Sequence, residues 1–105
     1  MASGTIRIKA KEKDGITEVK ALIKHPMENG VRKDLETGAL IPAHFIKEIE
    51  CVLGDKVATS AIWSGAVSKN PYWSFKIKGA AKGDTLKITW KDNKGETDSK
   101  EAKIK

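Results

Sequence analysis

Apolar and polar residues alternate along most of the chain, which is the pattern of β-strands that bury one face. Seven short segments carry it, at residues 6–9, 18–24, 45–53, 56–62, 72–78, 86–91 and 96–104. The apolar side chains predicted to point inward are Ile6, Ile8, Val19, Ala21, Ile23, Phe45, Ile49, Cys51, Leu53, Trp73, Phe75, Ile77, Leu86, Ile88 and Trp90. In the third segment, Ile46 and Val52 make the opposite face partly apolar as well. The last segment is weakly patterned and is predicted to be an edge strand.

Turn residues separate these segments. Gly54 and Asp55 follow the third, and residues 92–95 read Asp-Asn-Lys-Gly, a sequence suited to a hairpin turn. No stretch has the spacing of an amphipathic helix. About seven antiparallel strands in 105 residues predict an all-β chain with one domain over 1–105, an immunoglobulin-like β-sandwich. An open β-barrel is the main alternative.

One connection is unusually long. Residues 25–42 read HPMENGVRKDLETGALIP and lie between two predicted strands. Structureless connections of this length are uncommon unless they are functional or disordered. Pro26 and Pro42 restrain the ends, and we expect Leu40 and Ile41 to pack inward. We therefore predict an ordered loop that shapes a protein surface.

The chain is basic, with 20 Lys and Arg against 14 Asp and Glu, a net charge of +6 and a pI near 9.5. Many lysines, however, alternate with apolar residues on the predicted strands, among them Lys76, Lys78, Lys87 and Lys91. Such lysines stand on a solvated face and discourage edge-to-edge aggregation. We therefore expect no nucleic-acid partner. We expect no membrane association either, because no apolar run is long enough to span a bilayer and the first residues do not resemble a secretory signal.

Four residues are potential soft or borderline metal ligands: His25, Met27, His44 and Cys51. A blue-copper site uses two His and one Cys, with Met as a weak axial ligand. The order of the residues is unfavourable, because Cys51 lies within an apolar strand and Met27 precedes it. We predict no metal and no cofactor, and we interpret Cys51 as a buried core residue. A regulatory or intermolecular disulfide is the alternative for this thiol.

No motif of nucleophilic, acid–base or phosphate-binding catalysis occurs in the sequence. His25 and His44 flank the long loop and are placed to approach each other across its base. A hydrogen-bonded structural pair is a commoner use of two such residues than an acid–base pair. The residue types thus predict a binding module and not an enzyme.

Tryptophan offers a second interpretation. Trp63 lies in a loop after a short strand, where we expect it to be exposed, and Tyr72 follows nine residues later. Exposed aromatic side chains in a row stack on sugar rings or anchor a protein partner. A carbohydrate-binding or adhesion sandwich is therefore the alternative function.

Several long motifs together resemble the SoxZ family. These are HPMENGVRKD at 25–34, LIPAHFI at 40–46, the cysteine at 51 and SKNPYWSF at 68–75. The resemblance covers nearly the whole chain and implies an immunoglobulin-like sandwich. It also implies a role in bacterial thiosulfate oxidation, as the non-catalytic subunit of the SoxYZ sulfur carrier.

The resemblance further implies a heterodimer with SoxY, whose C-terminal Gly-Gly-Cys-Gly-Gly arm carries sulfur. Other thiosulfate-oxidation enzymes would dock transiently, and the isolated subunit would be free to form homodimers. The family's periplasmic location is reached together with SoxY, which bears the export signal. The residues we expect to face the partner or its arm are His25, Met27, Arg32, Lys33, Asp34, Asn70, Pro71 and Tyr72. Arg32 and Lys33 would hold anionic sulfur groups or an acidic protein surface.

Overall fold

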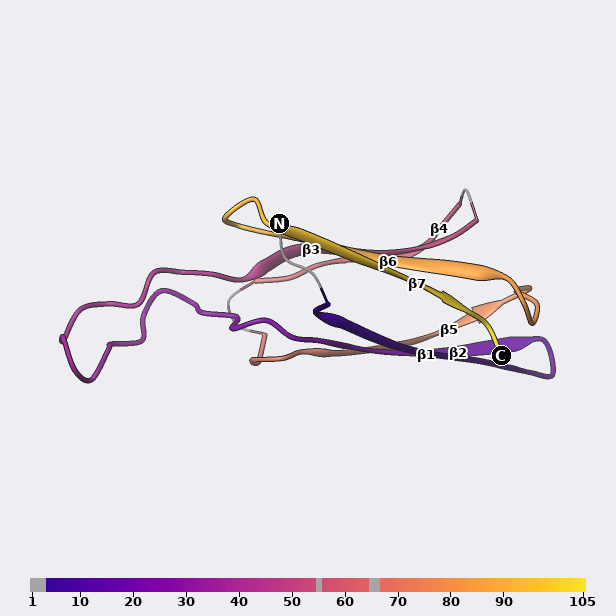
Figure 1. Cartoon of the computed structure of the whole chain (residues 1–105), viewed down its shortest axis with the longest axis horizontal. Helices are drawn as coiled ribbons and strands as arrows, with labels where there is room; N and C mark the ends of the chain where they lie inside the picture. Colours follow the sequence, from indigo (N-terminus) through magenta and orange to yellow (C-terminus); the bar gives the residue numbers. More distant parts are fainter. Residues whose placement is uncertain (1–3, 55, 65–66) are drawn as a thin grey trace.

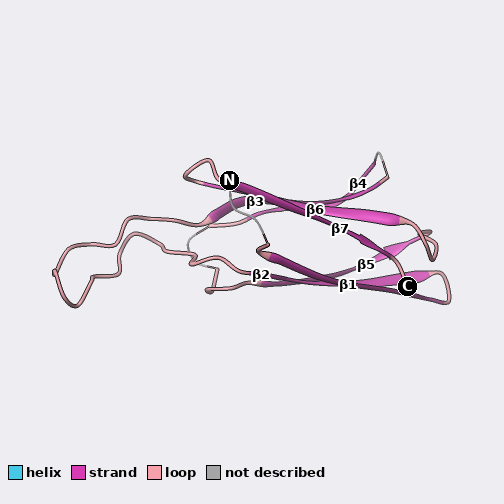
Figure 2. Cartoon of the chain, in the orientation of Figure 1, coloured by secondary structure: helices cyan, strands magenta, loops and turns pink. Residues whose placement is uncertain are grey.

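The computed structural model describes residues 4–54, 56–64 and 67–105, which form two antiparallel sheets packed face to face (Figures 1 and 2). The first sheet has the order β1-β2-β5 and the second the order β4-β3-β6-β7. The strands are β1 Ile6–Lys13, β2 Ile16–Ile23, β3 Ile46–Leu53, β4 Lys56–Ile62, β5 Tyr72–Lys78, β6 Thr85–Asp92 and β7 Thr97–Lys103. This is the predicted all-β sandwich, with β7 at an edge. No helix of the described residues is long and apolar enough to cross a membrane.

Most side chains predicted to point inward form the core between the sheets. Val19, Ala21, Cys51, Leu86 and Ile88 have no exposed surface. Burial in β2 and β6 alternates residue by residue, as the sequence pattern predicts. The four lysines named above are exposed, also as predicted. Of the predicted turn after β3, Gly54 is a turn residue and Asp55 lies outside the described residues.

A β-bulge corrects the predicted orientation of Ile46. On β3, Ile46 pairs with Asp92 while Glu48 pairs with Lys91, so Lys47 is an extra residue. An extra residue reverses the alternation of side chains locally. Ile46 therefore lies in the core, with no exposed surface, although simple alternation places it on the outer face.

The long connection forms an arm, which we define as residues 28–44, that projects beyond the sandwich (Figure 1). It makes the molecule elongated, with extents of 53 × 22 × 21 Å. The two legs of the arm are joined by backbone hydrogen bonds, including Glu28 N to His44 O at 2.7 Å and Ile41 N to Arg32 O at 2.8 Å. These bonds keep the arm ordered.

The expected packing of the arm's apolar residues is partly wrong. Ile41 is half-buried, but Leu40 is 59% exposed and Leu35 is fully exposed. The arm consists of two extended legs side by side, and among the described residues no second layer covers them against which these side chains could pack (Figure 1). Backbone hydrogen bonds, and not apolar burial, therefore hold the outer part of the arm.

Candidate partner-binding site

The two most distinctive motifs of the sequence lie side by side. The His25 amide donates to Asn70 Oδ1 at 3.0 Å, and the Asn70 amide donates to the His25 carbonyl at 2.9 Å. The Ile23 amide donates to the Pro71 carbonyl at 3.0 Å. Asn70 has a φ of +52°, a conformation that Asn tolerates better than most residues. The segment that leads from β2 into the arm therefore lies against the loop before β5.

A buried cluster of two histidines and one aspartate lies at the base of the arm. Oδ2 of Asp92 is 3.1 Å from Nε2 of His25 and 2.7 Å from Nε2 of His44. The two imidazole centroids are 4.6 Å apart, and the ring of His25 also meets Trp90 edge-on at 5.2 Å. The predicted approach of the two histidines is thus confirmed. Asp92, which joins the two histidines, was not predicted from the sequence, because an aspartate at the start of an Asp-Asn-Lys-Gly hairpin is typical of a turn.

Asp92 fixes the arm to the β6–β7 hairpin. Its Oδ1 accepts the backbone amides of Lys94 and Glu96 at 3.0 and 2.8 Å, while Oδ2 faces the histidines. Burial alone would raise the pKa of Asp92, but the hydrogen bonds from both histidines and both amides outweigh it and lower this pKa. Burial lowers the pKa of His25, although its bond to Asp92 acts in the opposite sense. The cluster therefore favours an ionised Asp92 beside a neutral His25.

The three side chains of this cluster also form the group of described residues best placed to hold a metal ion. Nδ1 of His25, however, accepts the amide of Met27 at 3.1 Å, so the proton of the neutral ring resides on Nε2. That proton points at Asp92 and blocks the nitrogen that faces the other ligands. A ligating His normally donates its second ring N–H to an acceptor, which is the reverse of this arrangement. The geometry suits a hydrogen-bonded clamp better than a metal centre.

The residues predicted to face the partner fall into two groups. Arg32, Lys33, Asn70 and Tyr72 are exposed, and Asp34 is half-buried. The side chains of His25, Met27 and Pro71 are enclosed, with only 4% of His25 and 6% of Met27 exposed. These three residues therefore support the loops from within and offer no surface to a partner. Partner contact stays a prediction for the others.

Arg32 is already paired within the arm. Its guanidinium lies 2.5 Å from Oε1 of Glu28, and Nε contacts both carboxylate oxygens at 3.2 Å. These contacts use Nε and Nη2 of Arg32, so its predicted role in holding an anion would fall to the remaining N–H donors of the guanidinium. Asp34 caps a turn by accepting the Glu36 amide at 2.8 Å, which shapes the outer end of the arm.

The thiol of Cys51 is enclosed between the sheets and is unsuited to chemistry. It has no exposed surface, and burial raises its pKa to about 11. The nucleophile and metal ligand is the thiolate, which such a pKa disfavours. Cys51 is also not part of the histidine cluster among the described residues, so the His-His-Cys set of a blue-copper site does not form there.

The exposed row of aromatic residues expected for carbohydrate binding is not formed. Trp63 is half-buried and packs edge-on against Trp73, with ring centroids 6.2 Å apart. Tyr72 is 60% exposed but points to the opposite side of β5 from Trp73, because successive strand residues alternate. The expected exposure of Trp63 was wrong because its packing against the core depends on β5, which is distant in sequence.

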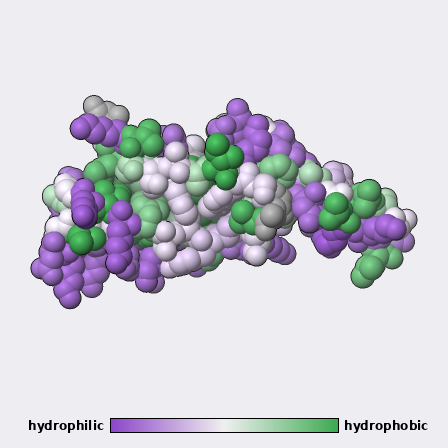
Figure 3. Space-filling view, turned by 180° about the vertical axis from the view of Figure 1, so that it is seen from behind, coloured by the Kyte–Doolittle hydropathy of each residue, from purple (hydrophilic) through white to green (hydrophobic). Residues whose placement is uncertain are grey.

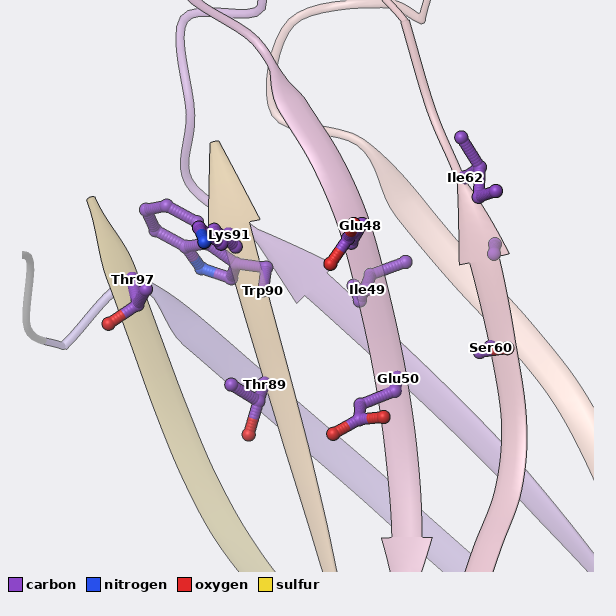
Figure 4. Close-up of a pocket in the computed structure, with 10 residues that line it drawn as sticks. Glu48, Ile49, Glu50, Ser60, Ile62, Thr89, Trp90, Lys91 and Thr97 are labelled. Atoms are coloured by element: carbon purple, nitrogen blue, oxygen red, sulfur yellow. The ribbon is translucent and has the colours of Figure 1, made fainter. Parts of the chain in front are cut away.

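A shallow hollow of about 430 Å³ lies on the β4-β3-β6-β7 sheet (Figure 4). Figure 4 shows Glu48 and Glu50 on β3, Thr89 and Lys91 on β6, and Ile62 at the β4 edge. No histidine or cysteine is among the described residues that line it.

Comparison with known proteins identifies the family. The family model "Sulphur oxidation protein SoxZ" matches residues 6–103. The chain belongs to the SoxZ family. The SoxZ match spans all seven strands and both motif loops, and it makes the chain a sulfur-oxidation protein. No curated protein matches the chain.

Two solved structures share the fold of this SoxZ-family chain. A crystal structure of superoxide reductase in the oxidized state aligns with a TM-score of 0.67 and 16% identity, over 96% of this chain and 87% of that one. A hypothetical protein from Pyrococcus horikoshii OT3 aligns with the same score and identity, over 100% and 96%. At such identity the likeness extends to the sandwich architecture alone.

Proposed function

We propose that this chain is the non-catalytic subunit of a SoxYZ-type sulfur carrier. It binds a SoxY-like subunit and helps to present that subunit's C-terminal Gly-Gly-Cys-Gly-Gly arm to successive enzymes of thiosulfate oxidation. The observation that carries the proposal is the SoxZ family match over residues 6–103. The resulting heterodimer would work in the periplasm, which the chain would reach together with its partner.

The burial of Cys51 supports a carrier in which a second subunit provides the reactive thiol. A sulfur carrier needs a thiol that is exposed and ionisable, because the thiolate is the reactive form. Cys51 is the single cysteine of the chain, and it is buried with a pKa raised to about 11. The reactive thiol of the complex would therefore belong to the partner.

The paired loops support a docking role. The segment that leads into the arm is joined to the loop before β5 through His25 and Asn70. Residues of the arm and of this loop line one concave surface. Arms held by backbone hydrogen bonds and a buried clamp lose little conformational freedom on binding, which favours affinity. Exposed apolar residues at Val31, Leu35 and Leu40 offer contact area to a protein.

The decisive experiment is capture of the chain from its native cells, with intact-mass analysis of the proteins that co-elute. We expect one stoichiometric partner that ends in Gly-Gly-Cys-Gly-Gly and carries additional sulfur mass that a thiol reductant removes. A Cys51→Ala variant should capture the same partner. Recovery of the chain without such a partner, or thiosulfate turnover by the chain alone, would refute the proposal.

The contribution of the arm can be tested in the same complex. Removing the charges of Lys33 and Arg32 by substitution with Ala should weaken the docking of a partner enzyme or of the carrier subunit. Lys87→Ala, on the outer face of β6, is the matched control. Equal binding by all variants would exclude the basic residues of the arm from the interface. Periplasmic fractionation of cells would test the location.

A further inference from the structure

The two sides of the sandwich are built differently. On one side, β1 and β7 are closed together by the C-terminus: the Lys105 amide donates to the Ala10 carbonyl at 3.0 Å, and the Glu12 amide donates to the Lys105 carbonyl at 2.8 Å. Asp98 adds to this closure by accepting the amide and hydroxyl of Thr5 at 3.0 and 2.5 Å. On the other side, β4 and β5 are edge strands of different sheets, and no pairing joins them among the described residues. The sandwich is therefore open along β4 and β5.

The open side leaves core-facing side chains incompletely covered. On β5, Trp73 pairs with Ala21 and Phe75 pairs with Val19 of the neighbouring β2. The β2 residues of these pairs have no exposed surface, whereas the β5 residues are only half-buried. Ile77, on the same face of β5, is half-buried too. On the inner face of this sheet, the side chains of β2 are thus completely buried, whereas those of the neighbouring β5 are partly exposed.

Aromatic side chains concentrate at this opening. Trp63, at the end of β4, meets Trp73 edge-on, and Trp73 meets Phe75 with ring centroids 4.6 Å apart. Along the β4 edge, Val57 and Ile62 are 60% and 88% exposed, and Ile62 lies on the outer face of its sheet, where it pairs with Glu48. Figure 3 looks at this side, and pale and green surface crosses its middle between purple margins. Partly buried tryptophans beside exposed aliphatic residues are typical of the energetic centre of a protein interface.

The charges at this opening favour a different protein over a second copy of the chain. β4 and β5 contain three lysines, Lys56, Lys76 and Lys78, and no aspartate or glutamate. Lys76 and Lys78 lie on the outer face of β5, opposite to Trp73 and Phe75, and so form part of the rim of the opening. In a two-fold symmetric homodimer the same patch meets itself, so these positive charges would face one another. Like charges across an interface cost free energy, whereas an acidic rim would attract them.

The open side is also continuous with the arm. Val67, Ser68 and Lys69, in the connection from β4 to β5, line one concave surface with residues 26–32. A partner that binds β4 and β5 would therefore also contact the base of the arm.

We propose that the open β4–β5 side, centred on Trp63, Trp73 and Phe75, is the surface that binds the SoxY-like subunit, through an apolar face rimmed by acidic side chains. This inference rests on the proposed function and assigns the interface within it. The unpaired outer edges of β4 and β5 additionally offer backbone groups to an extended segment of the partner.

The test compares matched variants in binding the co-purifying subunit that ends in Gly-Gly-Cys-Gly-Gly. The double change Lys76→Glu and Lys78→Glu reverses two charges on the outer face of β5, at the rim of the opening. The double change Lys9→Glu and Lys103→Glu makes the same charge reversal on the closed side. We expect the first pair to raise Kd by at least about tenfold at low salt, and less at high salt, because exposed charges are screened. The second pair should leave Kd within about threefold.

Two further measurements separate contact from loss of folding. Ile62→Ser alters a side chain that is 88% exposed, so folding should be retained while Kd rises several-fold. Hydrogen exchange should slow in residues 56–63 and 72–78 on binding, and not in residues 6–13.

The outcomes distinguish this inference from the proposed function. Failure of the wild-type chain to bind any such subunit would overturn both. Normal binding that both double variants weaken equally, or that neither weakens, would overturn the interface and keep the proposed function. A wild-type homodimer that Ile62→Ser disperses would assign the open side to a second copy and also overturn the inference.

Discussion

Asp92→Asn is the sharpest test of the clamp at the base of the arm. The substitution preserves shape but replaces one carboxylate oxygen by an amide NH2. In the native chain both oxygens accept hydrogen bonds: Oδ1 from the backbone amides of Lys94 and Glu96, and Oδ2 from the histidines. The single oxygen of the Asn side chain can accept either from the two backbone amides or from the histidines. Its NH2 group must then face the donors that are left.

The structure allows the cost to be worked out for each orientation. With the amide oxygen toward the hairpin, the NH2 faces the Nε2–H of His25; a change of tautomer would turn a ring N–H toward the Met27 amide instead. With the oxygen toward the histidines, two backbone amides lose their acceptor. A buried donor left without a partner costs about 1–3 kcal/mol, and loss of the charge weakens the bonds that remain. We therefore expect Asp92→Asn to lower the free energy of unfolding by about 2–4 kcal/mol.

Urea denaturation followed by tryptophan fluorescence measures this difference directly. The matched control is Glu96→Gln, which makes the same chemical change to a half-exposed side chain 3.4 Å from His44. Exposed pairs contribute little, so the control should change stability by no more than about 0.5 kcal/mol. A loss below about 1 kcal/mol for Asp92→Asn, with an unchanged denaturant dependence, would refute the clamp.

Three further outcomes follow from the same structure. Because burial lowers the pKa of His25, the unfolded chain binds more protons than the folded chain just below pH 6.5. The free energy of unfolding should therefore fall as the pH drops through that value, by at most about 1.4 kcal/mol per pH unit. His25→Gln should flatten this slope. Cys51, with its pKa of about 11 and no exposed surface, should resist alkylation at pH 8 until denaturant is added; rapid labelling of the folded chain would contradict its placement. Gly30→Ala should speed hydrogen exchange in the arm and lower the free energy of unfolding by about 1 kcal/mol, because the φ of Gly30 is +86° and a new Cβ would lie 3.3 Å from Ala43 Cβ. The control Gly38→Ala, where φ is +72° and a new Cβ would have no atom within 4 Å, should lower it less.

The strands were predictable because each buries one face, and alternation records that face directly in the sequence. The prediction was wrong where a feature of pairing changes the alternation. Ile46 was placed outward because the extra residue Lys47 cannot be recognised without its partner strand β6. Leu40 was placed inward because an apolar residue suggests burial, although the arm has no second layer to cover it.

The candidate site was predictable only in part, for a related reason. His25 and His44 stand at the two ends of one loop, so their approach follows from the chain alone. Asp92 is 48 residues from His44 and reaches it through the bulged pairing of β3 with β6. Likewise, the incomplete burial of Trp73 depends on β5 being an edge strand, which local alternation does not reveal.

The position of the clamp explains how a long arm and an open sandwich can serve one interface. The arm leaves from β2, in one sheet, and returns to β3, in the other, so its base bridges the two layers. Asp92, at the end of β6, holds both legs of that base against the second sheet through His25 and His44. Along β1 the layers are joined by the backbone hydrogen bonds of Lys105 to Ala10 and Glu12. The buried clamp joins the layers a second time, at the end of the sandwich. The clamp involves neither the exposed residues of the arm nor Trp63, Trp73 and Phe75, so both groups stay available for contact with a partner.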